Sequence, residues 1–309
     1  MSFTPSISKI TEDDDALEAL LADSGVELPP LLPALAFALG DLSIFPTDFS
    51  LDPTKTLEEQ GGLTAEEQEQ VRQAALKALQ RLRDEPASHE TVSDTDLSKI
   101  MSWACGTELT GSYLQMMKEE LSPNNVDLRS PDWTRADIHP ERKFTVAIIG
   151  AGMSGILAAY RLKQAGVDFV LFEKNDAIGG TWLENTYPGC RVDVSNHVYC
   201  YSFMQKHDWP HFHSTQRVLL QYFNDCADLF GIRENIRFKT EVSSVVWNEE
   251  FSNWDLEIFS DDGEQVFTCE SVISAVGQLN RPSYPDIPGI HEFNGASWHS
   301  ANWDHDYDL

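Results

Sequence analysis

The chain has 309 residues, and its 50 acidic and 22 basic side chains give a net charge of −28 at neutral pH. Because such a surface repels polyanions, nucleic acid and anionic membranes are excluded as expected partners. Hydrophobic residues make up 41% of the chain and charged residues 23%, which is typical of a soluble globular protein. At ~150 residues per domain, we expect about two domains.

The cysteine content favours reduced thiols. The five cysteines are odd in number and include no C-x-x-C pair, so neither a disulfide framework nor a metal site is expected. The N-terminus is acidic and lacks the basic and apolar regions of a secretory signal, and no apolar run approaches the ~18 residues of a membrane span. We therefore expect a cytoplasmic protein.

Residues 1–139 are predicted to form an all-α N-terminal domain. Thr64 and Glu67 have the spacing of a capping box, in which each side chain bonds the other residue's amide at the start of a helix. Helical patterns predict helices over residues 13–22, 64–83, 97–103 and 113–121, and the strongly apolar segment 30–42 is expected to be buried.

The first of these helices carries three acidic residues at its start. Asp13, Asp14 and Asp15 could suggest a metal site, but a solvated cap is the simpler interpretation because the helix dipole favours carboxylates there. Leu17 and Leu20 are expected to lie on the same buried stripe.

A change in composition near residue 140 marks the boundary between the two domains. Residues 122–142 are rich in Pro, Asn, Asp and Ser, as linkers are. Beyond them strands and helices alternate, which predicts an α/β fold: a Rossmann-like parallel sheet with an antiparallel β-meander. The expected strands are 144–149, 169–172, 236–240, 243–247, 254–259, 265–269 and 272–275, and the expected helices are 153–164 and 215–230. Ser214 is predicted to cap the second helix, and Asp262-Gly263 to form a hairpin turn.

The sequence Gly150-Ala-Gly152-Met-Ser-Gly155 follows the first strand of this second part and opens a helix. Gly150 permits a tight turn, Gly152 lets amides approach a pyrophosphate, and Gly155 lets helix and strand pack closely. The helix N-terminus supplies donors and partial positive charge to phosphate groups.

Glu173 ends the second strand, where an acidic residue binds ribose hydroxyls in dinucleotide-binding proteins. A carboxylate at this position favours the unphosphorylated ribose of FAD or NAD over the 2′-phosphate of NADP. The alternative is a glycine-rich turn beside a solvated glutamate.

Two further segments carry a specific resemblance. Gly179-Gly-Thr-Trp182 follows Glu173, and then comes Asn185-Thr-Tyr-Pro-Gly-Cys-Arg-Val-Asp193. Near the end, Phe293-x-Gly-x-x-x-His299-x-x-x-Trp303-Asp contains the infrequent residues His and Trp at fixed spacing. With the glycine turn, these segments resemble the Baeyer–Villiger flavin monooxygenase family from about residue 142 to 306, and the acidic helical leader resembles an aryl-ketone oxygenase of that family more weakly.

The resemblance implies that residues 140–309 are an FAD-binding domain and assigns residues by their matching positions. The implied contacts with FAD are Gly150, Gly152, Ser154, Gly155, Glu173, Gly180, Thr181, Trp182, Asp193, Tyr199 and the backbone of Val242. Arg191 and Asp193 are implied to lie on the nicotinamide side of the active site, and His299 to couple cofactor binding to turnover. On physical grounds alone His299 is equally consistent with a structural histidine, and Cys190 is expected to be a small packed residue.

The implied reaction uses FAD, NADPH and O2 to insert one oxygen atom beside a ketone carbonyl, which yields an ester or lactone. Family members continue well beyond the length of this chain, and their NADP-binding glycine motif and active-site arginine are expected after Leu309. We therefore expect this chain to be an N-terminal fragment that is inactive or incomplete alone.

Two alternatives stay open. An N- or S-oxygenating flavin monooxygenase uses the same cofactors, although members of that group carry Tyr or Phe in place of Trp303. A non-catalytic FAD-binding or assembly protein is the other, with residues 1–139 as a homodimerisation module. An apolar face such as Leu31, Leu32, Leu35 and Phe37 is more often part of a core than of an interface.

Overall fold

The computed structural model describes residues 10–85, 92–121 and 126–308, and it divides into two compact units between Val126 and Asp127. Residues 127–139, predicted to form part of the linker that ends the N-terminal domain, contact the second unit. Asp127 pairs with Arg161, and the amide of Arg135 donates to the carbonyl of Ala165 over 2.8 Å. These contacts move the boundary about a dozen residues toward the N-terminus from the expected position near residue 140.

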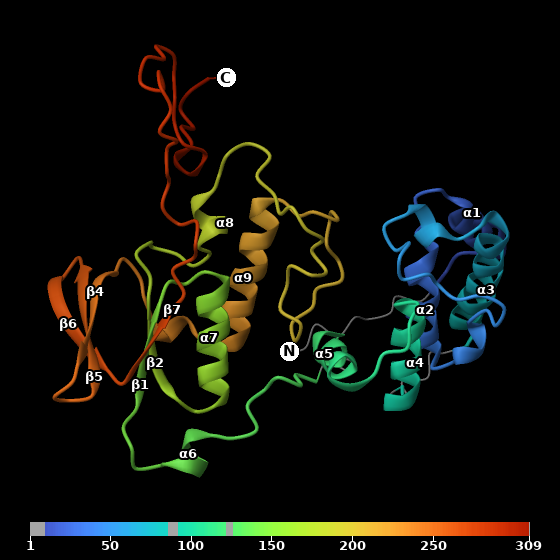
Figure 1. Cartoon of the computed structure of the whole chain (residues 1–309), viewed down its shortest axis with the longest axis horizontal. Coiled ribbons are helices and arrows are strands. Elements are labelled where there is room, and N and C mark those ends of the chain that lie inside the picture. The colour runs from blue at the N-terminus through green and yellow to red at the C-terminus, as the bar shows by residue number, and fades with distance from the viewer. Residues whose placement is uncertain (1–9, 86–91, 122–125, 309) are drawn as a thin grey trace. The chain divides into compact units, whose positions relative to one another are not determined.

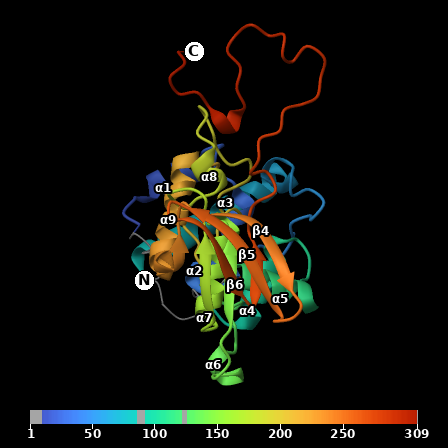
Figure 2. The same cartoon turned by 90° about the vertical axis from the view of Figure 1, so that its left-hand side faces the viewer.

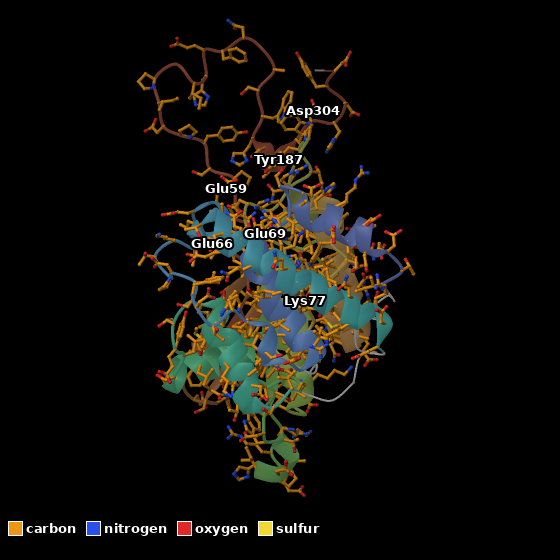
Figure 3. The ribbon with its side chains drawn as sticks, turned by 90° about the vertical axis from the view of Figure 1, so that its right-hand side faces the viewer. Glu59, Glu66, Glu69, Lys77, Tyr187 and Asp304 are labelled. Carbon is orange, nitrogen blue, oxygen red and sulfur yellow. The ribbon has the colours of Figure 1, made fainter. Side chains whose placement is uncertain are left out.

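The first unit is helical. Its helices are α1 (Asp14–Ala22), α2 (Leu28–Leu39), α3 (Ala65–Asp84), α4 (Asp94–Ala104) and α5 (Gly111–Leu121). The capping box at the start of α3 is present, since Thr64 N donates to Glu67 Oε2 over 2.7 Å and Glu67 N to Thr64 Oγ1 over 3.3 Å. Figure 3 shows the exposed face of α3, with Glu66, Glu69 and Lys77 along it.

The core of the helical unit lies between α2 and α3. Leu32 and Leu35 of α2 are buried there against Val71 and Ala75 of α3, and each buried large aliphatic side chain contributes roughly 1.5–3 kcal/mol.

One expectation for α1 needs correction. Leu20, expected on the buried stripe of α1, is 54% exposed, because Leu17 and Leu21 form that stripe.

Most of the apolar segment 30–42, which was expected to be buried, lies in α2. The helix begins at Leu28, and prolines fit its first turn because their missing amide hydrogen has no partner to lose there. At the start of α1, Asp13 Oδ1 accepts the amide of Ala16 over 2.9 Å, as a cap does.

The second unit is built around a parallel sheet. Strands β1 (Thr145–Ile149), β2 (Asp168–Phe172), β3 (Ile236–Arg237) and β7 (Ser271–Ser274) are ordered β3-β2-β1-β7. Helices α7 (Met153–Gln164) and α9 (Gln216–Phe230) cover one face of the sheet (Figure 1). The other face carries an antiparallel meander of β4 (Glu241–Asn248), β5 (Asn253–Ser260) and β6 (Gly263–Cys269), which Figure 2 shows in front. The predicted Rossmann-like α/β class is confirmed.

Alternate residues of β1 serve the two layers. Val146 and Ile148 face the helices, where they pack with Ile156 of α7, whereas Ala147 faces the meander and packs with Leu256 of β5. This alternation follows from the two-residue repeat of a strand, and it leaves the central strand buried on both sides.

Three local expectations in this unit are wrong in detail. β3 has two residues, because Lys239 and Thr240 turn to donate their amides to the carbonyls of Asn175 and Glu173. Thr215, not Ser214, is the N-cap residue of α9. The hairpin turn is Asp261-Asp262, and Gly263 is already the first residue of β6, paired with Ser260.

Short helices complete the two units: α6 (Arg135–Ile138), α8 (Thr181–Glu184), and single 3-10 turns at Leu42–Ile44, Glu59–Gly62, Arg233–Asn235 and Ser300–Asn302. Among the described residues, no helix has the length and apolar character needed to cross a membrane.

Candidate dinucleotide site

The glycine turn between β1 and α7 has no room for a side chain at Gly150 or Gly155. Gly150 has φ 100°, and a Cβ there would lie 2.7 Å from the carbonyl oxygen of Ala275. A Cβ on Gly155 would lie 1.9 Å from the carbonyl oxygen of Gly150, so only glycine lets α7 pack this closely on the turn. The first amides of α7 have no partner within the helix and remain as donors for an anion.

A second glycine segment packs against this turn. The amide of Gly179 donates to the carbonyl of Ala151 over 3.0 Å, and Gly180 has φ 53°. A Cβ on Gly180 would lie 3.0 Å from the Cα of Gly152, and one on Gly152 would lie 3.6 Å from the Cα of Gly180. The two glycine backbones therefore pack directly against each other with no side chain between them. This side-chain-free backbone, called the cradle below, leaves its amides open to the approach of a diphosphate.

Glu173 lies at the end of β2, directly beside the cradle. Its side chain is only 3% exposed, and Oε2 accepts the amide of Ala151 over 2.7 Å while Oε1 accepts the amide of Asn175 over 2.9 Å. A carboxylate has about four acceptor positions, so these two bonds leave capacity for ribose hydroxyls. The structure thus brings the predicted acidic residue to the glycine turn and shows it holding that turn.

Trp182 and Tyr199 form a contact behind the second glycine segment. The indole Nε1 of Trp182 donates to the hydroxyl of Tyr199 over 3.2 Å, and the two rings meet edge to face with centroids 5.7 Å apart. Trp182 is buried, while the neighbouring Thr181 and, on α7, Ser154 are exposed and free to face a ligand. Gln216 of α9 donates its side-chain amide to the carbonyl of Trp182.

The predicted active-site pair lies in one three-residue stretch. Arg191 and Asp193 are both exposed, and Val192 between them is buried. Arg191 bridges Thr215, and the carbonyl of Cys190 accepts the amide of Gln216 over 2.9 Å, which anchors the stretch to the start of α9. Cys190 is buried, in agreement with its expected packing role.

Val242 lies near Glu173 through the chain that precedes it. The amide of Thr240 donates to the carbonyl of Glu173 over 2.9 Å, and Val242 follows two residues later at the start of β4, paired with Ile258. The backbone of Val242 is thereby placed on the side of the sheet end that carries the carboxylate.

The predicted C-terminal motif is folded mainly on itself. His299 caps a short 3-10 turn by accepting the amide of Ala301 over 3.1 Å, and its ring meets Tyr284 edge to face at 5.6 Å. Trp303 packs edge to face on Trp298 at 5.3 Å. The segment reaches the rest of the unit through His305, whose Nε2 lies 2.7 Å from Thr186 Oγ1. Within the described residues, the contacts of His299 are local ones.

A family model for flavin-binding monooxygenase-like proteins matches residues 143–308, more than half of the chain. The chain belongs to the flavin-binding monooxygenase-like family.

Curated relatives place this family member beside Baeyer–Villiger enzymes. It is 44% identical over 165 residues to a Baeyer–Villiger monooxygenase of Streptomyces coelicolor, covering 53% of this chain and 31% of that protein. A Baeyer–Villiger monooxygenase of Pseudomonas aeruginosa is 40% identical over 169 residues, with 54% and 32% covered. The chain thus spans about a third of the length of the curated relatives that it matches.

One relative matches beyond the α/β unit. An uncharacterized monooxygenase of Sinorhizobium fredii is 34% identical over 246 residues, covering 79% of this chain and 36% of that protein. Because this alignment is longer than the unit that starts at Asp127, it includes part of the helical unit. Part of that helical unit is therefore shared with another monooxygenase.

Two solved structures of monooxygenases are similar to part of the chain. Cyclohexanone monooxygenase from Rhodococcus sp. Phi1 bound to NADP+ is 35% identical, with 54% of this chain and 32% of that chain covered and a TM-score of 0.48. The OTEMO complex with FAD and NADP is 34% identical, with 57% and 31% covered and a TM-score of 0.47.

The sequence did not identify the contacts that hold the site of this flavin-binding monooxygenase-like chain together. Tyr201 donates its hydroxyl to the carbonyl of Met153 over 2.6 Å, and Asn196 is fully buried with its side chain bonded to Ser214 over 2.8 Å. Tyr199 and Tyr201 lie two residues apart in the sequence, but only the fold shows what they contact.

Proposed function

We propose that the protein is an FAD- and NADPH-dependent Baeyer–Villiger monooxygenase, which inserts one oxygen atom of O2 beside a ketone carbonyl to give an ester or lactone. The observation that carries the proposal is the side-chain-free cradle formed by the backbones of Gly152 and Gly180, with Glu173 buried beside it. It stands in a chain that is 44% identical to a Baeyer–Villiger monooxygenase. Residues 140–309 would be the first part of the FAD domain.

The residues of the cradle fit the adenosine diphosphate half of FAD. The glycine turn and the first amides of α7, with Ser154 beside them, would meet the diphosphate. Glu173 would accept the ribose hydroxyls, and Gly180, Thr181, Trp182 and Tyr199 would line the path toward the flavin. The backbone of Val242 would close the adenine side.

When bound, FAD supplies the redox chemistry, taking hydride from NADPH and activating O2, while the protein orients it and excludes water. Arg191 and Asp193 would lie on the nicotinamide side. The exposed carboxylate of Asp193 is suited to hold a cationic side chain near developing negative charge. His299 would act through the C-terminal segment that His305 joins to Thr186, and would couple cofactor binding to turnover.

The substrate class that we propose is an aryl or cyclic ketone, by resemblance of the helical leader and of Trp303-Asp-His-Asp306 to 4-hydroxyacetophenone monooxygenase. The relative of Sinorhizobium fredii supports a monooxygenase context for the helical unit as well. An N- or S-oxygenating enzyme is the competing reaction, and Trp303 within the C-terminal motif argues against it.

The test has two stages. The 309-residue chain, reconstituted with FAD and desalted, is expected to retain one flavin, seen as a yellow protein with a resolved visible spectrum. The protein at the full length of its relatives is then supplied with NADPH and with 4-hydroxyacetophenone, cyclohexanone, a tertiary amine or a sulfide in parallel. Ester or lactone products support the proposal. A colourless protein refutes the FAD site, and N- or S-oxides alone refute the Baeyer–Villiger reaction.

A binding-only role is the other alternative, with residues 1–139 as a homodimerisation module. A chain that binds FAD, elutes as a dimer and fails to oxidise NADPH at full length would favour it. A monomeric, NADPH-oxidising protein excludes it.

A further inference from the structure

A buried tyrosine ties the loop after Asp193 to the glycine turn. The side chain of Tyr201 is 6% exposed, and its hydroxyl donates to the carbonyl of Met153 over 2.6 Å. Met153 is the first residue of α7 and directly follows Gly152, so this hydrogen bond holds the N-terminal end of the helix, next to the cradle.

Tyr201 is itself held from α9. Its amide donates to the hydroxyl of Tyr222 over 2.9 Å, and that hydroxyl donates to the carbonyl of Met204 over 2.8 Å. Burial raises the pKa of both phenols well above the ordinary value, so both hydroxyls keep their protons and stay donors. The ring of Tyr201 stacks on Phe203 at 5.4 Å and meets Phe223 edge to face at 5.9 Å, which leaves it one orientation.

The same stretch also holds the second glycine segment. Tyr199, two residues before Tyr201, accepts the indole N–H of Trp182, which lies in the turn after Gly180. Tyr199 and Tyr201 therefore bond to the elements on the two sides of the cradle, and the three-residue segment 199–201 connects these elements.

We propose that Tyr201 is a positioning residue of the dinucleotide site, which fixes the first turn of α7 relative to the segment that starts at Gly179. The ligand assigned to the site, the diphosphate of FAD, rests on the proposed function. Preorganised donors bind more tightly because the ligand does not have to order them. Without the hydroxyl, the first turn of α7 opens more often, and the binding-competent fraction falls with it.

The test compares Tyr201→Phe with Tyr160→Phe in the full 309-residue chain. Both changes remove one phenolic oxygen and keep the ring. Tyr160 also lies on α7, where it stacks on Phe230 at 4.0 Å, and no hydrogen bond of its hydroxyl is found within the described residues. Amide hydrogen exchange of the apo-protein over residues 150–157 is one readout, and the dissociation constant of FAD is the other.

One buried hydrogen bond corresponds to about a three- to ten-fold change in an equilibrium constant. Tyr201→Phe is expected to speed exchange in the first turn of α7 by about that factor and to weaken FAD binding by a similar factor, with exchange in β4–β6 unchanged. Tyr160→Phe is expected to match the unsubstituted chain in both.

Equal exchange of residues 150–157 in the two variants overturns the inference. So does faster exchange with unaltered FAD affinity, because Tyr201 then serves the fold alone. Exchange that rises equally throughout the unit shows general destabilisation and also overturns it. If the unsubstituted chain does not bind FAD, the proposed function fails, while the exchange comparison still decides whether Tyr201 holds the turn.

Discussion

The carboxylate of Glu173 accepts the amide hydrogen of Ala151 over 2.7 Å, and so joins the end of β2 to the turn that follows β1. Its spacing from the glycine turn predicts that this glutamate binds a ligand. The structure shows that it also holds the backbone in place, because its second oxygen accepts the amide of Asn175 and the side chain is buried. The Glu173 side chain therefore organises the turn without a bound dinucleotide. A change at this residue is expected to affect both the stability of the fold and the affinity for the dinucleotide.

Replacing Glu173 with glutamine is expected to lower both stability and FAD affinity. The amide side chain keeps one acceptor oxygen but presents N–H groups to the other backbone amide, so one buried donor loses its partner. Hydrogen bonds to charged groups are worth about 1.5–3 kcal/mol, and we expect a loss in this range in urea unfolding. FAD titration is expected to show a dissociation constant raised at least about ten-fold. Glu249→Gln, in the exposed turn after β4, is the control, and equal effects of the two changes would refute the role given to Glu173.

Two glycine substitutions are expected to separate folding from binding. A Cβ on Gly155 meets the carbonyl oxygen of Gly150 at 1.9 Å, so Gly155→Ala must push α7 from β1, at a cost of about 1–3 kcal/mol or more. A Cβ on Gly152 meets the Cα of Gly180 at 3.6 Å, an ordinary contact, and φ there is −78°. Gly152→Ala is therefore expected to unfold like the unsubstituted chain.

FAD binding is expected to be strongly weakened in both variants. Gly155→Ala displaces α7, whose first amides would meet the diphosphate, and the methyl group of Gly152→Ala covers part of the cradle itself. Normal FAD affinity in Gly152→Ala would contradict the placement of the diphosphate. Normal stability in Gly155→Ala would contradict the packing argument.

The fold of the α/β unit was largely predictable from its sequence, because the pattern of apolar residues within each short segment indicates a strand or a helix. The run before Gly150 is continuously apolar, as a strand buried on both faces requires, and α7 was predicted with its observed bounds. Prediction failed where contacts between residues distant in the sequence determine the length of an element or the boundary of a unit. Nothing local shows that Thr240 bonds the backbone of Glu173, and that bond shortens β3. Likewise Asp127 lies in a linker-like stretch, and its partners in the second unit, Arg161 and Gln164, are more than thirty residues away in the sequence.

The candidate site was predictable as a set of residue types, and less so as a geometry. Glycines and an acidic residue at fixed spacing suffice to predict a dinucleotide turn, and the structure brings Gly152, Gly180 and Glu173 together. The roles assigned to Arg191, Asp193 and His299 stay predictions. The buried partners Tyr201 and Asn196 could not be found from sequence, because each acts on a backbone group whose neighbours in space are distant in the chain.

The helical unit is expected to lose stability in acid through Asp41. The Arg81 guanidinium, 2.6 Å from its carboxylate, lowers the pKa of Asp41 from 3.8 to about 2, aided by the side chain and amide of Ser43. A lowered folded-state pKa means that the unfolded chain binds the proton more tightly. The stabilisation is therefore complete above pH 4 and is lost as the pH falls toward 2.

The pair is partly exposed, so solvent screening limits its contribution to about 1 kcal/mol at most. Asp41→Asn is expected to be less stable than the unsubstituted chain at pH 7 and pH 5 by the same amount, and by less at pH 3, in urea unfolding followed by circular dichroism. Asp48→Asn, whose carboxylate meets the neutral amide of Gln70, is the control. A difference that grows toward low pH would contradict the sign of the shift.

Asn196 is expected to be the most sensitive polar residue of the loop that carries Tyr199 and Tyr201. It has no exposed surface; Oδ1 accepts the amide of Ser214 over 2.9 Å, and Nδ2 donates to the hydroxyl of Ser214 and the carbonyl of His211. The change Asn196→Asp conserves shape but turns the donor into an acceptor facing two oxygen atoms. An unpaired buried charge costs about 3–5 kcal/mol, and the α/β unit is expected to lose stability in that range at pH 7.

The loss from Asn196→Asp should shrink as the pH falls, because burial raises the pKa of the new carboxyl group and protonation restores a donor. Asn185→Asp is the matched control, since its side chain donates to the carbonyl of Thr181 over 3.0 Å at an exposed position. Urea unfolding of both variants at pH 5 and pH 7 measures the contrast. Because the loop ends at the start of α9, loosening it also frees Tyr201, and faster amide exchange at residues 150–157 is expected in Asn196→Asp alone. Equal losses in the two variants would show that burial of the Asn196 amide does not govern this loop.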